Sequence, residues 1–172
     1  MFKKLCLSVF LFAGLLLIGA PNGAQAAEPR LMETHGNWLV YSFVEDGNKV
    51  CYMASKPTKA EGKYSRRGEI FALVTNRPAE KTKNVFSYIA GYDYKAGSDV
   101  SVEIDGQRFI LFTQDSTAWA PDAQTDNRLA DAMRKGSKMV VKGTSKRGTV
   151  TKDTFSLKGS SAAHGKVNAE CR

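Results

Sequence analysis

Apolar and polar residues alternate along most of the chain, which is the pattern of β-strands with one buried and one solvated face. One alternating run extends from Trp38 to Val44, and a second covers residues 49–55. Asp46-Gly47 lies between the two runs, and this dipeptide favours the two-residue turn of a β-hairpin. The sequence therefore predicts a hairpin over residues 38–55.

The middle of the chain predicts further short strands. Residues 69–75 and 85–90 are apolar-rich, and the first of these segments is followed by Arg77-Pro78. The alternating residues 100–104 and 109–112 flank Asp105-Gly106, which is the strongest hairpin signal in the chain. Residues 56–68 carry many lysines, arginines and glycines with few apolar residues, so we expect a basic loop there.

One short helix is predicted over about 122–135, because Pro121-Asp122 is a helix-start signal and Gly136 is a stop signal. A last hairpin is predicted over 138–158, and residues 160–170 are expected to add an edge strand. About eight short strands and one short helix favour an all-β fold, either an antiparallel β-sandwich or a flattened barrel.

The first 26 residues resemble a cleavable secretory signal. Lys3 and Lys4 precede an apolar stretch over residues 5–20, and Ala24-Gln25-Ala26 is a small-x-small cleavage site. The alternative is an uncleaved membrane anchor, but the apolar stretch is shorter than the roughly 20 residues that span a bilayer. We therefore expect cleavage near Ala26, a loose lead-in over residues 27–36 and a single domain over residues 37–172.

Cysteine usage agrees with export to an oxidising compartment, in the periplasm or outside the cell. Cys6 lies in the predicted leader, so Cys51 and Cys171 remain in the mature chain. Two cysteines in an exported protein favour a disulfide, and the alternative is two free thiols.

The charge predicts anionic partners. Removal of Lys3 and Lys4 lowers the net charge from +8 to +6. Such a balance favours phospholipid head groups, lipopolysaccharide or sulfated glycans on the envelope or on a host-cell surface. Nucleic acid is an implausible partner outside the cytoplasm.

Catalytic motifs are missing from the sequence. His35 and His164 have no acidic or cysteine neighbour at metal-ligand spacing, and neither a Gly-x-Ser-x-Gly elbow nor a phosphate-binding glycine motif occurs. We therefore predict a protein that is not an enzyme and that needs no metal or cofactor.

The predicted last hairpin places lysines on one face. Lys138, Lys142 and Lys146 share one parity, and Lys152 and Lys158 share a parity across the turn. This face is a candidate anion-binding surface, which the basic loop at 56–68 would extend if the fold brings it near. The alternative is a solvated face whose lysines prevent edge-to-edge pairing.

Aromatic residues at strand ends are a second set of candidates for partner contact. They are Tyr88, Tyr92, Tyr94 and Trp119. Tyrosine and tryptophan are enriched at interfaces. The alternative is that these side chains close the end of the sandwich.

Several segments together resemble the invasion-associated locus B family of exported alphaproteobacterial proteins. They are Gly36-Asn37-Trp38, Val50-Cys51-Tyr52, residues 75–78, residues 117–121, residues 135–149 and residues 153–159, ahead of Cys171. The resemblance implies an immunoglobulin-like β-sandwich and a role linked to entry into host cells. It implies no catalytic residue.

Two functions are consistent with these features. The first is a non-enzymatic exported protein that acts by binding at the envelope or at the host interface. The second is a periplasmic envelope-maintenance or chaperone-like factor with no direct host contact.

Overall fold

The computed structural model describes residues 28–172, so the predicted leader and its cleavage site lie outside the described residues. The first strands are β1 (Arg30–His35), β2 (Trp38–Glu45), β3 (Asn48–Ser55), β4 (Lys59–Gly62), β5 (Phe71–Arg77) and β6 (Thr82–Ile89). The later strands are β7 (Val100–Ile104), β8 (Gln107–Gln114), β9 (Thr117–Trp119), β10 (Lys138–Thr144) and β11 (Val150–Ser156). The helices are the 3₁₀ turn η1 (Pro78–Glu80), α1 (Ala123–Lys135) and α2 (Ser160–Glu170).

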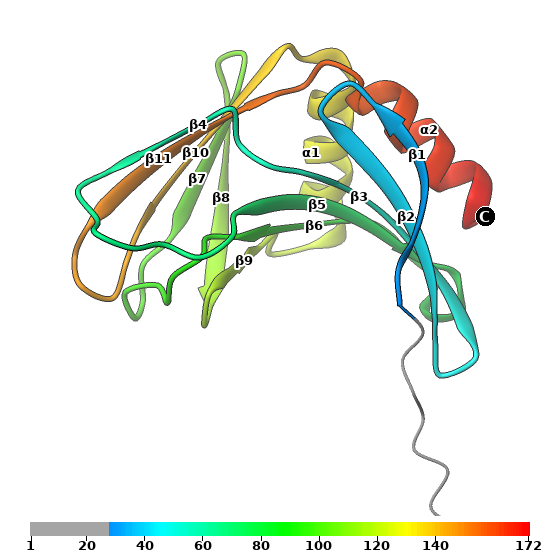
Figure 1. Cartoon of the computed structure of the whole chain (residues 1–172), viewed down its shortest axis with the longest axis horizontal. Helices are drawn as coiled ribbons and strands as arrows, with labels where there is room; N and C mark the ends of the chain where they lie inside the picture. Colours follow the sequence, from blue (N-terminus) through cyan, green and yellow to red (C-terminus); the bar gives the residue numbers. More distant parts are fainter. Residues whose placement is uncertain (1–27) are drawn as a thin grey trace, which may run out of the picture.

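These strands form one continuous antiparallel sheet in the order β1-β2-β3-β5-β6-β9-β8-β7-β10-β11-β4. β8 joins two halves of the sheet, because its first part pairs with β7 and its last three residues pair with β9. The half that contains β10 and β11 runs at a steep angle to the half that contains β5 and β6 (Figure 1). The sheet therefore folds over on itself, which confirms the predicted all-β, sandwich-like class.

The core lies between the two halves and beneath the helices. Tyr88 of β6 and Phe155 of β11 meet edge to face, with ring centroids 6.2 Å apart. Trp38 of β2 is fully buried and donates its indole N–H to the Ser156 carbonyl at 3.0 Å. α1 packs against β6, and α2 packs against β1, β2 and β3. Burial of each large apolar side chain contributes on the order of 2 kcal/mol.

The turns follow the sequence signals. Asp46-Gly47 and Asp105-Gly106 have positive φ at both positions, as the two-residue hairpin turn requires, and they join β2 to β3 and β7 to β8. The Asp122 carboxylate accepts the Thr125 amide N–H at 2.7 Å, which caps α1 at its first turn. Both hairpins and the helix are therefore as predicted.

Three segments differ from the sequence predictions. Residues 30–35 were expected to be a loose lead-in, but they form β1 and pair with β2. Residues 59–62 were expected to lie in a loop, but they form β4 and pair with the outer edge of β11. The predicted edge strand at 160–170 is wrong, because this segment is α2. Its buried residues Ser160, Ala163, His164 and Val167 recur at helical spacing.

No helix within residues 28–172 has the length and apolar character needed to cross a bilayer.

Candidate functional site

Cys51 and Cys171 form a disulfide, as predicted. Cys51 lies in β3 and Cys171 directly follows α2, and the two positions are 120 residues apart in sequence. Both residues are buried. The bridge therefore fixes the C-terminal helix against the first half of the sheet.

The lysines of the last hairpin lie on its solvent face, opposite the buried Met139, Val141 and Phe155. Lys142 and Lys152 are cross-strand partners. Lys138 and Lys146 are separated by about 26 Å at the rise of an extended strand. The five predicted lysines therefore do not converge on one point, and Lys146 alone belongs to the recess described next.

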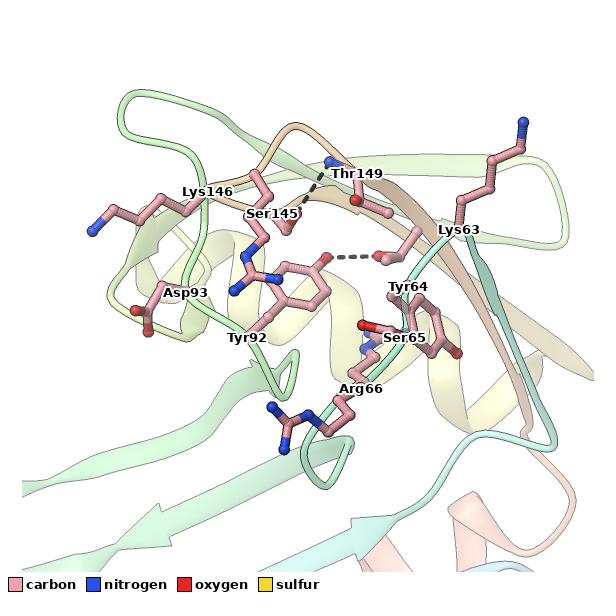
Figure 2. A pocket seen from close by; sticks show the side chains of 12 residues that line it. Lys63, Tyr64, Ser65, Arg66, Tyr92, Asp93, Ser145, Lys146 and Thr149 are labelled. Atoms are coloured by element: carbon pink, nitrogen blue, oxygen red, sulfur yellow. Dashed lines mark hydrogen bonds between the residues drawn. The ribbon is translucent and has the colours of Figure 1, made fainter.

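A recess of about 540 Å³ lies at the tip of the β10–β11 hairpin. Its walls come from the loop after β4, the segment after β6 and the β10–β11 turn (Figure 2). We call it the basic recess; it is lined by Lys63, Tyr64, Ser65, Arg66, Arg67, Tyr92, Asp93, Ser145, Lys146, Arg147, Thr149 and Thr151. The fold thus brings the predicted basic loop to one end of the lysine-bearing hairpin.

Backbone contacts hold these three segments together. The Lys146 amide donates to the Asp93 carbonyl at 2.7 Å, which ties the hairpin tip to the segment after β6. The Gly68 amide donates to the Gly91 carbonyl at 2.8 Å, which ties that segment to the basic loop. Gly91 has a φ of 71°, and a Cβ there would lie 2.4 Å from the Gly68 carbonyl oxygen. A glycine is therefore required for this close approach.

Arg67 forms the floor of the basic recess. Its side chain is 3% exposed and makes a bidentate ion pair with the fully buried Asp153, at 2.8 and 2.6 Å. It also donates to the Ala90 carbonyl at 2.7 Å and to the Tyr88 hydroxyl at 3.0 Å. Burial is the largest single influence on the pKa of Arg67 and acts to lower it, but the hydrogen bonds and charge of Asp153, together with the neighbouring tyrosines, raise this pKa above its usual value. The charge of Arg67 is thus neutralised within the protein.

Two tyrosine rings lie close to the Arg67 guanidinium. Its carbon lies 4.9 Å from the centroid of Tyr92 and 5.4 Å from that of Tyr64, both within cation–π range. The Tyr92 hydroxyl is hydrogen bonded to the Thr151 hydroxyl at 2.6 Å (Figure 2). Burial raises the pKa of Tyr92, although Thr151 and Arg67 act in the opposite direction. Tyr92 therefore presents a neutral, fixed ring to the recess.

Of the predicted aromatic contacts, Tyr92 alone lines the recess. Tyr88 and Tyr94 are 1% and 6% exposed, so the prediction of exposed contact residues is wrong for both. They pack in the core, as the alternative of end-closing aromatics describes. Trp119 is half-buried in β9 and pairs with Ser87 and Phe112, away from the recess.

Free positive charge surrounds the recess. Lys63, Arg66, Lys146 and Arg147 are exposed, and none of them forms an ion pair with another residue of the described chain. Figure 2 shows Lys63, Arg66 and Lys146 on different sides of the central Tyr92 ring. Asp93 is the acidic residue of the lining. Four cations around one carboxylate give the recess an excess of positive charge.

The two histidines lie elsewhere. His35 contacts Glu33 at 2.9 Å on β1. His164 is buried in α2, where its ring nitrogens contact Asn84 at 2.7 Å and Asn168 at 3.2 Å. Within residues 28–172, histidine, cysteine and acidic side chains do not gather into a group able to hold a metal ion.

Several recess residues were missed by the sequence analysis. Tyr64 and Asp93 carry no local motif. Asp153 did carry a signal, because it shares the inward parity of Thr151 and Phe155 on β11. An acidic residue at an inward position needs hydrogen-bond or ion-pair partners, and Arg67 supplies the ion pair for Asp153.

Comparison with known proteins places the chain in a family. The model of the invasion associated locus B (IalB) protein family matches residues 38–168. The crystal structure of invasion associated protein B from Bartonella henselae superposes with a TM-score of 0.59 at 17% identity, covering 82% of this chain and 97% of that chain. No curated protein sequence matches. The structural likeness shows a shared fold, and the family match over most of the domain shows that this chain belongs to the invasion associated locus B protein family.

Proposed function

We propose that this protein is exported and acts by binding, without catalysis, an anionic ligand in the basic recess. The observation that carries this proposal is the set of four cations, Lys63, Arg66, Lys146 and Arg147, that form no ion pair within residues 28–172 and surround a floor whose own charge is neutralised. A ligand therefore meets fixed positive charge without displacing an internal ion pair. The shared chemistry of the ligand is a sulfate, carboxylate or phosphate group on an envelope or host-cell surface.

Two observations support export and binding. The buried Cys51–Cys171 disulfide is typical of proteins in oxidising compartments. The recess offers serine and threonine hydroxyls and a tyrosine, but neither histidine lines it to serve as a base. The hydroxyl groups and cations of the recess suit recognition of a ligand by charge and hydrogen bonding.

The binding part of the proposal is tested with three probes: a sulfated oligosaccharide, purified lipopolysaccharide and phosphatidylglycerol vesicles. The test variant is Arg66→Gln with Arg147→Gln, which removes two charges from the recess. The matched control is Lys138→Gln with Lys158→Gln, which removes two charges at the other end of the same hairpin. We expect the recess variant to lose at least ten-fold in affinity for one or more probes, with the control within two-fold of wild type.

Equal losses in both variants would show that net charge, and not the recess, governs binding. Absence of binding to every probe would reject the proposed function. The three probes also separate the possible sources of the anionic group, because each presents a different one.

Export is tested by protease treatment of intact cells and by immunodetection in surface, periplasmic and medium fractions. Digestion on intact cells, or recovery from the medium, supports direct contact with a host or environment. Full protection until the outer membrane is opened supports an envelope-maintenance factor. Detection in the cytoplasmic fraction alone would reject export.

A further inference from the structure

Two further hollows follow the basic recess around the hairpin tip, and each shares lining residues with the one before it. The second hollow shares Lys63, Arg147 and Thr149 with the recess and extends to Val150. The third shares Val150 with the second and extends onto the outer face of the sheet, where Lys142 lines it. Together the three hollows form a path, which we call the tip groove.

The outer end of the tip groove is also basic. Arg108 of β8 and Lys142 of β10 are exposed and line the third hollow. Neither forms an ion pair within the described chain, and Asp99 is the acidic residue in that lining. Lys142, Ser101 and Ile110 occupy one row across β10, β7 and β8. At the strand spacing of about 4.8 Å this row alone extends the groove by roughly 10 Å.

From this series of adjoining basic hollows we propose that the tip groove binds a linear anionic polysaccharide, one end of which occupies the basic recess. The proposal rests on the proposed function, because the recess is the first subsite of the groove. A chain with repeated anionic groups would contact Arg66 and Lys146 in the recess first, then Lys63 and Arg147, which line both the recess and the second hollow, and finally Lys142 and Arg108.

The shape of the path favours a flexible chain over a membrane surface. The recess reaches the inner side of the hairpin, where Thr151 is buried, whereas Lys142 lies on the outer side of the same strands. A flat bilayer cannot contact both faces of one sheet at once. A chain that bends around the tip contacts both.

The neutral groups along the path favour sugar over other polyanions. Ser65, Ser145 and Thr149 offer hydroxyls in the recess, and Tyr64 is partly exposed there. Ile110 and Val150 are 45% and 65% exposed along the outer part of the groove. Sugar rings present both hydroxyl groups and apolar C–H faces, so they match this alternation of polar and apolar surface.

The test uses the disulfide-bonded mature protein and sulfated oligosaccharides of increasing length, from disaccharide to decasaccharide, titrated by calorimetry. Affinity should rise about ten-fold from the shortest to the longest chain, because exposed charge contacts are individually weak but additive in number. The dependence of affinity on salt should steepen in parallel, since each added contact releases further counterions.

The decisive variant is Arg108→Gln with Lys142→Gln. It should abolish the gain with chain length and leave disaccharide affinity within two-fold of wild type. The control is again Lys138→Gln with Lys158→Gln, which should keep the length dependence.

An affinity that does not depend on chain length, with disaccharide binding intact, would refute binding along the tip groove and would leave binding in the recess unaffected. Tighter binding to phosphatidylglycerol vesicles than to the longest chain would overturn it in favour of a membrane surface. Equal binding of a single-stranded oligonucleotide of matched charge would overturn the assignment to a polysaccharide.

Discussion

The buried pair Arg67–Asp153 is the clearest place to test the physical account of the recess. Asp153→Asn keeps the shape of the side chain and removes its charge. The Arg67 guanidinium would then stay buried, 3% exposed, without a compensating carboxylate. Removal of one partner from such a pair costs about 3–5 kcal/mol. For a domain of this size the melting temperature should fall by roughly 10 °C.

A second substitution separates the orphaned charge from other causes. Arg67→Met in the Asp153→Asn background removes the uncompensated guanidinium and replaces it with a shorter, unbranched apolar side chain. The double variant should therefore be more stable than Asp153→Asn alone, by on the order of 1–3 kcal/mol. Loss of the bond from Arg67 to the Ala90 carbonyl limits the recovery.

Urea and thermal unfolding of the wild type, both single variants and the double variant at pH 7 measure these values. A matched surface control is Asp131→Asn, which breaks an exposed pair with Arg134 and should change stability by less than about 1 kcal/mol. The reasoning is refuted if Asp153→Asn costs less than about 1 kcal/mol, or if the double variant is no more stable than that single variant.

Three further predictions concern stability. Cys51→Ala with Cys171→Ala should lower the free energy of unfolding by about 5 kcal/mol, because the loop of 120 residues is no longer closed; urea melts check this, and a loss under about 1 kcal/mol would contradict it. Burial raises the pKa of Asp126 to about 6, although the hydrogen bond that it accepts from the Phe86 amide acts to lower this pKa. The contribution of Asp126 to folding stability is therefore complete below about pH 4 and is lost as the pH rises through 6. Asp126→Asn should therefore be more stable than wild type at pH 7, by up to about 3 kcal/mol, and equal to it near pH 4 in melts across that range. Burial lowers the pKa of His164, so the wild type should lose stability as the pH falls below about 6.5; His164→Gln should show a flatter profile, and an unchanged slope would count against a buried neutral ring.

Much of the fold was predictable because its signals are local. Asp105-Gly106 adopts positive φ at both residues as the hairpin requires, and Asp122 caps α1 through its own carboxylate. Alternation along β10 separated the exposed Lys142 from the buried Met139 and Val141. Each of these features depends on residues within a few positions of one another, so the sequence contains the whole signal.

The wrong predictions concern segments whose structure is determined by contacts with distant parts of the sequence. β4 is short and has few apolar residues, and it forms by pairing with β11, which lies about 90 positions later in the chain. α2 has a weakly amphipathic sequence, and its place is determined by the Cys51–Cys171 disulfide and by burial against the first half of the sheet. The recess could not be located from sequence for the same reason, because its three walls come from distant segments.

The recess and the contacts that stabilise the C-terminal helix lie in different parts of the molecule. The disulfide and α2 stabilise one end of the molecule, whereas the β10–β11 tip lies at the other (Figure 1). The rim cations make no ion pairs within residues 28–172, so substitution of Arg66 or Arg147 should remove the proposed ligand contacts without breaking an ion pair of the fold. The fold shared with the Bartonella protein, at 17% identity, does not establish a role for these side chains, because function depends on the residues of the site and not on the scaffold. Under the proposed function, whether the protein acts on a host or within the envelope depends on what its hairpin tip binds, and variants at that tip test this in a protein that keeps its fold.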